Sequence, residues 1–391
     1  MTIPISATCL PSQRSLFDVP RHVAYFNCAY NSPQLNVARE RLLASVVRKS
    51  YPWERTVGDF FADAESIRDL AASVFGGEAE GYAIVPAASY GLSTAARALQ
   101  AKLAPRDRIL VLDEEFPSNY YPWLRIAGET GAVVEVVPKP TNGDWTQALL
   151  ARLGRDVRAV SVVHCHWTNG AYVDLTAIGR ACRDIRAALV VDATQSFGAM
   201  PLSLSEVQPA FLIAAGYKWL LCPYGVGLLY VDEEWRDSRP LEETWLARRG
   251  AENFSELTKY VDAYLPGARR FDVGEKCTTN LPAAVAALEQ IGSWTVERIA
   301  LSLRAINRQI AAFLEALDFQ LPRAEMRCPH MIGSLLPPSY SGDFVGALRA
   351  RNIFVSQRGN AVRFAPHLHI DDEDLARLFQ SIEDVVRQGT Q

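Results

Sequence analysis

The sequence predicts an α/β protein built around a mostly parallel sheet. From about Phe60 onward, short runs of apolar and β-branched residues alternate with segments of helical period. Strands that alternate with helices form largely parallel sheets, in which functional side chains gather at the carboxyl ends of the strands. The 391 residues are 49% hydrophobic and 21% charged, which is typical of a soluble globular protein and indicates two or three structural units.

The first large unit is expected to carry most of the strands. The strongest strand patterns cover residues 82–85, 109–112, 133–137, 159–163, 189–192, 211–215 and 226–231. The clearest helix follows Asp174, a favourable N-cap residue, and places Ile178, Cys182 and Ile185 on one face.

The pattern changes after Val231. Residues 232–260 are charged and rich in tryptophan and arginine, which indicates a surface helix or a connector. Helical segments at 282–291 and 296–317, strands at 353–356 and 361–364, and a helix opening at the acidic run 371–374 indicate a smaller α+β unit. The expected domains are an N-terminal arm (1–20) packing with the small domain, a large domain (21–292) and a small C-terminal domain (293–391).

The charge and the cysteines limit the classes of partner and the cellular compartment that are expected. The 40 basic and 44 acidic residues give a net charge of −4, so neither nucleic acid nor an anionic membrane is an expected partner. Seven scattered cysteines without a CxxC pair indicate reduced core thiols, and no signal peptide is apparent, which together predict a cytoplasmic protein.

One apolar stretch, residues 207–231, is long enough to span a bilayer. Its only charge is Lys218, which would cost roughly 2.5–3.5 kcal/mol near the bilayer centre, and glycines and a proline interrupt the stretch. We therefore expect no membrane span here, and a single lysine in apolar surroundings.

Asp192 and Lys218 end two successive predicted strands. A buried carboxylate needs a cation or hydrogen-bond donors, and a lysine in apolar surroundings is suited to Schiff-base chemistry. Adjacent parallel strands would bring both side chains to one crevice. A structural ion pair between them explains the spacing equally well.

Two further segments follow strand ends. Ser89, Tyr90 and Gly91 open a helix, whose free N–H groups suit a phosphate, although an ordinary serine N-cap is the simpler interpretation. Phe116, in an aromatic-rich loop after residues 109–112, could lie against a planar ring or simply pack in the core.

Two more polar groups need explanation. His164 and His166 would share a face of a strand, but no other Cys or His recurs at zinc-ligand spacing, so no metal is expected. Arg363 is flanked by apolar residues and is expected to point inward toward an anion, either a substrate carboxylate or a structural one.

Taken together, these motifs resemble the aminotransferase class V superfamily of pyridoxal-phosphate enzymes, which have fold type I. The resemblance runs from YFNCAYNSP, beginning at Tyr25, to VRFAPHLHI, ending at Ile370, and is most specific at Asp192–Gln195 and Gly216–Lys218. It implies a large domain with a mostly parallel central sheet, a smaller α+β domain and a homodimer with sites at the interface.

The resemblance also implies roles. Lys218 would carry pyridoxal 5'-phosphate as the internal aldimine, and Asp192 would hold the ring nitrogen protonated. The other implied cofactor contacts are Gln195 at the phenolic oxygen, Phe116 stacked on the ring, Ser89, Tyr90 and Tyr217 at the phosphate, and Thr278 or Thr279 at the phosphate of the neighbouring subunit. The implied substrate contacts are Arg363 at the carboxylate, with Asn31, Trp167 and Asn169 nearby.

One departure bears on the reaction. Cysteine desulfurases carry a nucleophilic cysteine shortly before the carboxylate-binding arginine, whereas residues 352–363 contain none. The expected activity is therefore aminotransferase first, then C–S or other β-elimination lyase, then amino-acid epimerase. A cofactor-free binding or regulatory module is the non-enzyme alternative.

Overall fold

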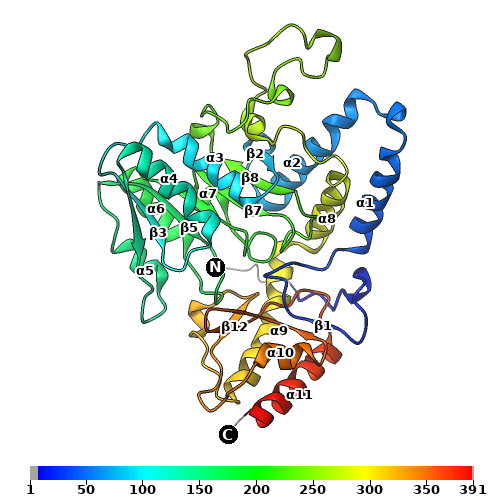
Figure 1. Cartoon of the computed structure of the whole chain (residues 1–391), viewed down its shortest axis with the longest axis vertical. Coiled ribbons are helices and arrows are strands. Elements are labelled where there is room, and N and C mark those ends of the chain that lie inside the picture. The colour runs from blue at the N-terminus through cyan, green and yellow to red at the C-terminus, as the bar shows by residue number, and fades with distance from the viewer. Residues whose placement is uncertain (1–7, 390–391) are drawn as a thin grey trace.

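The computed structural model describes residues 8–389. Its centre is a seven-stranded sheet of order β2-β8-β7-β6-β5-β3-β4, as Figure 1 shows in part. Only β8 runs antiparallel to its neighbours, and the other pairings are parallel. The strands are β2 (Tyr82–Val85), β3 (Arg108–Leu112), β4 (Val133–Val137), β5 (Val157–Val163), β6 (Ala188–Asp192), β7 (Phe211–Ala215) and β8 (Gly227–Val231). The predicted α/β class is confirmed.

Helices cover both faces of this sheet. Alternate strand residues are therefore buried in two separate apolar clusters, one on each face. One cluster joins α3 (Ala88–Gln100) and α4 (Tyr121–Thr130) to the sheet. The other includes α2 (Ala62–Phe75), α6 (Leu175–Ile185) and α8 (Leu281–Trp294). The remaining helices of this part are α1 (Asn36–Lys49), α5 (Trp145–Leu150) and α7 (Leu204–Val207).

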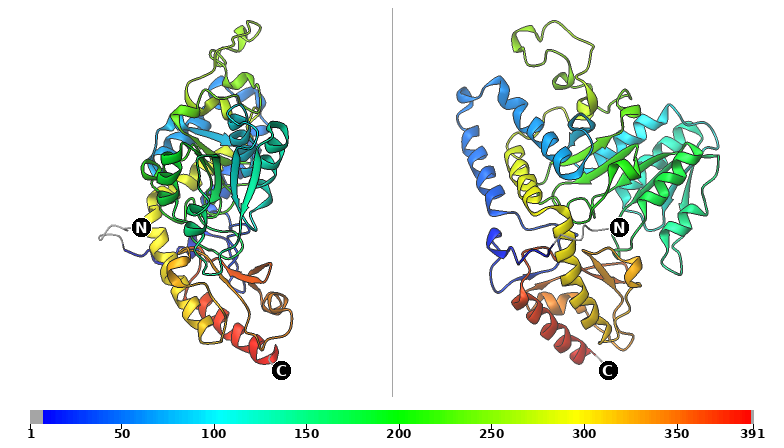
Figure 2. Two further views of the ribbon diagram at one scale, coloured as in Figure 1. Left: turned by 90° about the vertical axis from the view of Figure 1, so that its left-hand side faces the viewer. Right: turned by 180° about the vertical axis from the view of Figure 1, so that it is seen from behind.

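A third apolar cluster joins the C-terminal elements, which lie in the lower part of Figures 1 and 2. The long helix α9 (Val296–Glu315) leads into it, and α10 (Phe344–Arg349) and α11 (Asp372–Gly389) pack there. A three-stranded antiparallel sheet has the order β11-β12-β9, formed by Ser356–Arg358, Ala361–Phe364 and Ile332–Ser334. A short parallel pair joins β1 (Ala24–Tyr25) to β10 (Ile353–Phe354). The domain boundaries stay a prediction.

Local signals explain most element ends. The Asp174 side chain accepts the Ala177 N–H and caps α6 as predicted. The predicted strand at 353–356 is instead divided, since β10 pairs with β1 while β11 pairs with β12. Residues 232–260 contain only short 3-10 turns (Glu233–Trp235, Trp245–Ala247, Phe254–Glu256) and form the connector that projects at the top of Figure 1. Other 3-10 turns are Arg14–Leu16, Pro52–Glu54, Val57–Phe60, Ala79–Gly81, Pro117–Asn119, Gly267–Phe271 and Ala324–Met326.

Two expectations about composition can be compared with the structure. All seven cysteines are free, but Cys9 and Cys277 are exposed, so only five are core thiols. Within residues 8–389, no helix has the length and apolar character needed to cross a membrane. The apolar stretch 207–231 is instead divided among the end of α7, β7, the loop that carries Lys218, and β8.

Candidate active site

A cavity of about 240 Å³ opens at the carboxyl ends of the parallel strands. Asp192 ends β6, Ala215 ends β7, and Val163 ends β5. The start of α3 faces the same cavity. The lining residues are Ala87, Ala88, Ser89, Phe116, Ser118, Val163, Trp167, Asp192, Thr194, Gln195, Ala215, Tyr217 and Lys218. Seven of the predicted site residues therefore meet at one edge of the sheet.

Asp192 is 5% exposed at the end of a fully apolar strand. The Thr194 N–H donates to its Oδ1 at 2.9 Å, and the Thr194 hydroxyl accepts the N–H of Ala215 on the neighbouring strand. Burial raises the pKa of the Asp192 carboxyl, while the Thr194 hydrogen bonds and the charge of Lys218 act in the opposite direction. A cationic partner in the cavity would offset the cost of burying this carboxylate.

Lys218 lies in a tight loop just after β7 and is 8% exposed. The Cys222 N–H donates to the Gly216 carbonyl at 3.0 Å and closes the loop. A side chain at Gly216 would meet the Val226 carbonyl oxygen at 2.3 Å, so only glycine permits this close approach. Burial lowers the pKa of the Lys218 amine to about 8, against the opposing influence of Asp192.

The two charges face the same cavity without touching. Among residues 8–389, no ion pair within 4.0 Å involves Asp192 or Lys218. A direct structural ion pair, the alternative left open by the spacing, is therefore not formed, and both groups are free to contact a ligand.

The start of α3 offers free backbone donors. Its N-cap is Ala87, and no side chain caps it, so Ser89 is not an N-cap serine. Within the described part of the chain, the N–H groups of Ala88 and Ser89 have no acceptor, whereas the Tyr90 N–H donates to the Ala87 carbonyl. The Tyr90 side chain points toward Glu242, and Tyr90 does not line the cavity. The free donors suited to an anion are thus those of Ala88 and Ser89.

Aromatic rings form one wall. Phe116 is 37% exposed, and its ring meets that of Trp167 edge to face with centroids 5.3 Å apart. The Lys218 Nζ lies 5.7 Å from the centroid of Phe116 and 5.6 Å from that of Tyr217. Tyr217 stacks on Tyr224 at 3.9 Å. A partly exposed phenylalanine beside the lysine is a suitable surface for a planar ring.

Gln195 lines the cavity, but both ends of its amide already have partners. Nε2 donates to the Ala29 carbonyl at 2.9 Å, and Oε1 accepts the indole N–H of Trp219 at 3.0 Å. These bonds fix its orientation and tie the segment around Ala29 to the loop after Lys218.

Arg363 is 1% exposed and is not among the residues that line the cavity. Its guanidinium donates to the Ser356 hydroxyl at 3.0–3.2 Å and to the Trp167 carbonyl oxygen. Within the described residues it has no carboxylate partner, so the structural carboxylate considered from the sequence is not found. Burial and the charge of Arg358 lower the pKa of this guanidinium, as expected for a cation that lacks an anion.

Other predicted residues lie outside the cavity lining. Asn31 accepts the Tyr25 hydroxyl through its carbonyl, and Asn169 caps its own turn by accepting the Ala171 N–H. Thr278 and Thr279 line a different, smaller depression beside α1. Their roles stay predictions, and for the two threonines the predicted partner is a second subunit.

Glu115 is a further candidate residue, which was not predicted from the sequence. Its Oε2 is buried without a hydrogen-bond partner, and burial together with the nearby charge of Asp192 raises its pKa to about 8. Glu115 is the last of three consecutive acidic residues, a pattern typical of a solvent-exposed turn. Ser118 and Thr194 were also missed, although Thr194 lies inside the DATQ motif that drew attention to Asp192.

The histidines have other partners. His166 stacks on Trp145 and hydrogen-bonds Thr168 at 2.8 Å, while His164 packs against Tyr172. The strand β5 ends at Val163, so the two histidines do not share a strand face as expected. Within residues 8–389, no group of three or more His, Cys, Asp or Glu side chains is arranged to hold a metal.

These residues fit pyridoxal phosphate. The cavity holds an amine with a lowered pKa, a buried carboxylate with no cation in contact, two free N–H groups at a helix start and an exposed aromatic face. They match, in order, the aldehyde, the ring nitrogen, the phosphate and the ring of that cofactor.

Comparison with known proteins supports the same assignment. A protein of Bacillus subtilis (strain 168), the uncharacterized aminotransferase YcbU, is 25% identical over 379 residues, which are 95% of this chain and 97% of that protein. A probable cysteine desulfurase of Pyrococcus abyssi is 25% identical over 296 residues, 74% and 72% of the two chains.

Among solved structures, a C-DES mutant with glycine covalently linked to its PLP cofactor superposes with a TM-score of 0.86 at 20% identity. The match covers 95% of this chain and 99% of the other, and confirms the fold. The family model for aminotransferase class-V matches residues 41–378. The chain therefore belongs to the aminotransferase class-V family of pyridoxal-phosphate-dependent enzymes.

Proposed function

We propose that this protein is an aminotransferase that acts on an α-amino acid at the cavity of Lys218. The observation that carries the proposal is the pair of buried, unpaired charges, Asp192 and Lys218, which face one cavity beside the free N–H groups of α3. When bound, pyridoxal phosphate supplies an electron sink for a bond broken at the substrate α-carbon.

The side chains would divide the work. Lys218, whose amine is partly neutral near pH 8, would attach the cofactor and later move the α-proton. Asp192 would keep its charge against the ring nitrogen, and Arg363 would bind the substrate carboxylate after releasing the Trp167 carbonyl. The N–H groups of Ala88 and Ser89 would hold the phosphate, with Phe116 packed on the ring.

A β-eliminating C–S lyase is the second candidate. It is favoured by the relatives named as probable cysteine desulfurases. However, none of the residues that line the Lys218 cavity is a cysteine, and Cys328 is buried with its sulfur 3.8 Å from the carbonyls of His164 and Ala171. We therefore favour a lyase only in a form that does not hold sulfur on the protein.

Products distinguish the candidates. An aminotransferase incubated with an amino-acid panel should form at most one equivalent of 2-oxo acid, and should turn over only when a second 2-oxo acid is added. A lyase should release ammonia with pyruvate from cysteine or cystine without any acceptor. An epimerase should exchange the α-proton for solvent deuterium and invert the configuration at Cα, without releasing a 2-oxo acid or ammonia. Ammonia release without an acceptor would reject the aminotransferase assignment.

We further infer a homodimer. α1 exposes Leu43, Val46 and Val47, each more than half accessible, and the turn after α1 exposes Trp53. Thr278 and Thr279 line the depression beside this helix, away from the Lys218 cavity of their own chain. A second copy covering this apolar surface would be consistent with the predicted threonine contact across the interface.

A further inference from the structure

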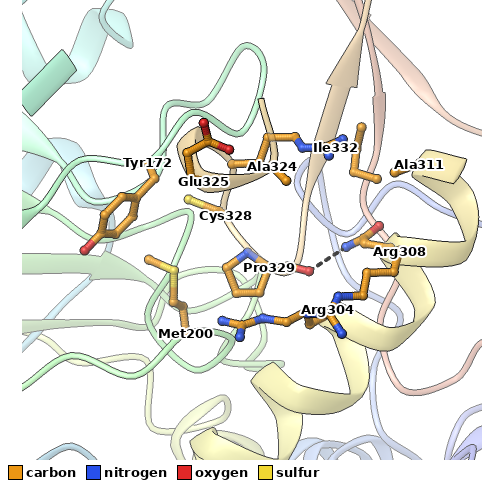
Figure 3. Close-up of a pocket in the computed structure, with 12 residues that line it drawn as sticks. Tyr172, Met200, Arg304, Arg308, Ala311, Ala324, Glu325, Cys328, Pro329 and Ile332 are labelled. Atoms are coloured by element: carbon orange, nitrogen blue, oxygen red, sulfur yellow. Dashed lines mark hydrogen bonds between the residues drawn. The ribbon is translucent and has the colours of Figure 1, made fainter. Parts of the chain in front are cut away.

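A second cavity, of about 540 Å³, lies between α9 and the segment around residues 324–332 (Figure 3). Tyr172 and Met200 close its other side. It shares no lining residue with the Lys218 cavity.

The cavity carries an excess of positive charge. Arg304 and Arg308 lie one turn apart on α9 and line it, together with Arg327, against one acidic residue, Glu325. Among residues 8–389, neither Arg304 nor Arg308 has a carboxylate within 4.0 Å. Two unpaired guanidiniums on one helix face match a carboxylate or phosphate.

Arg327 adds a third donor. Its Nη2 lies 3.7 Å from Glu315, but its Nη1 is buried and has no hydrogen-bond partner. Burial lowers the pKa of this guanidinium.

Asn307 forms part of the cavity wall. It is 5% exposed, and its Nδ2 donates to the Pro329 carbonyl at 2.9 Å. This hydrogen bond ties α9 to the segment around residues 324–332. Met200, Ala311 and Ile332 give the same cavity an apolar surface.

The wall of this cavity connects to the active site through one loop. Trp167 lines the Lys218 cavity, and Tyr172, five residues later, lines this one. The Cys328 N–H donates to the Gly170 carbonyl at 2.8 Å, and the Tyr172 N–H donates to the Met326 carbonyl at 2.9 Å. A ligand that shifts the segment 326–329 therefore acts on the loop that carries Trp167.

We propose that this cavity is an effector site for a small carboxylic acid with an apolar side chain. The carboxylate lies between Arg304 and Arg308. The apolar chain packs against Met200 and Ile332. Occupancy changes the affinity of the active site for its substrate through the loop 167–172, and the substrate changes effector affinity by the same factor.

The test uses the cofactor-loaded enzyme and 2-hydroxy-4-methylpentanoate, which lacks an amine and cannot form a Schiff base at the Lys218 site. Calorimetry should detect binding to the wild type, and the double variant Arg304→Gln/Arg308→Gln should bind at least tenfold more weakly, about 1.4 kcal/mol. Arg180→Gln is the matched control, since Arg180 is exposed on α6 and lies outside this cavity. Asn307→Asp, which places a negative charge beside the bound carboxylate, should also weaken binding.

Four outcomes would overturn the proposal. The first is equal affinity in the wild type and the double variant, or no binding at about 20 mM. The second is that inorganic phosphate binds and the hydroxy acid does not, which would mean a site for inorganic anions. The third is a saturating ligand that leaves the substrate KM of the wild type unchanged, which would remove the effector role. Loss of binding in Arg363→Ala but not in the double variant would place the ligand in the Lys218 cavity and also reject the site.

Discussion

Replacing Asp192 with asparagine should lower the pKa of Lys218 in the cofactor-free protein. Burial brings the pKa of this amine from 10.5 to about 8, and among the groups that act on it, Asp192 is the one that raises it. Asparagine keeps the size of the side chain and removes its charge, so the effect of burial is no longer opposed.

The expected magnitude follows from the pKa. At about pH 7.5, a lysine with a pKa of about 8 is roughly one quarter neutral, whereas a lysine at 10.5 is neutral in about one molecule per thousand. The neutral form is the nucleophile, so Lys218 carries a roughly 200-fold larger reactive fraction. Every 1.4 kcal/mol of lost attraction to Asp192 multiplies the ratio of neutral to charged lysine about tenfold further.

The measurement is competitive acetylation of the cofactor-free protein between about pH 6 and pH 11, with peptide mass spectrometry of Lys218. The midpoint of the rate profile, not its height, reports the pKa, because a buried amine reacts slowly at any pH. Lys102, which is exposed, serves as the reference within the same sample, and Asp192→Glu keeps the charge as a control. A wild-type midpoint near that of free lysine, or a midpoint in Asp192→Asn that does not fall, would refute the reasoning.

Other changes test the remaining parts of the site. Arg363→Ala should lower kcat/KM by about ten- to hundredfold, because a charged hydrogen bond to substrate is worth about 1.5–3 kcal/mol; an unchanged KM would mean that the carboxylate binds elsewhere. Replacing each of the seven cysteines singly with serine should leave turnover intact, and a folded but inactive variant would favour a desulfurase that holds sulfur on that cysteine. Val47→Asp on α1 should convert the proposed dimer to a monomer, measured by light scattering, and a variant that stays dimeric would remove α1 from the interface. Glu115→Gln should make the protein more stable relative to wild type at about pH 9 than at about pH 5, measured by thermal melting.

The strands that carry the site could be predicted because they are buried on both faces. Such strands appear as continuous β-branched or apolar runs, and the observed bounds differ from the expected ones by at most two residues. Asp192 and Lys218 stood out for the same reason, since an isolated charge in an apolar run is visible in the sequence alone. β9 was missed because three residues with a central glycine give no periodic signal.

Backbone donors and tertiary contacts could not be read in this way. Which N–H groups stay free at the start of α3 depends on which residue is the N-cap. That residue is Ala87 and not the expected serine. The hydrogen bonds that occupy the Gln195 amide join segments far apart in the chain, around Ala29 and Trp219. A motif identifies such a residue but not the contacts it makes before a ligand arrives.

Glu115 shows how a residue without a sequence signal can affect the pH behaviour of the site. Its pKa in the folded protein, about 8, exceeds its ordinary value of 4.5, so the native state binds more protons than the unfolded chain between these limits. Stability contributed by the protonated carboxyl is therefore complete below about pH 4.5 and is lost as the pH rises through about 8. Glutamine has no proton to lose, so the stability of the Glu115→Gln variant rises relative to that of the wild type only at high pH. Because the charge of Asp192 is one cause of the raised pKa, Asp192→Asn should lower the pKa of Glu115 and move this loss of stability to lower pH. An unchanged midpoint would show that the two carboxyls do not interact.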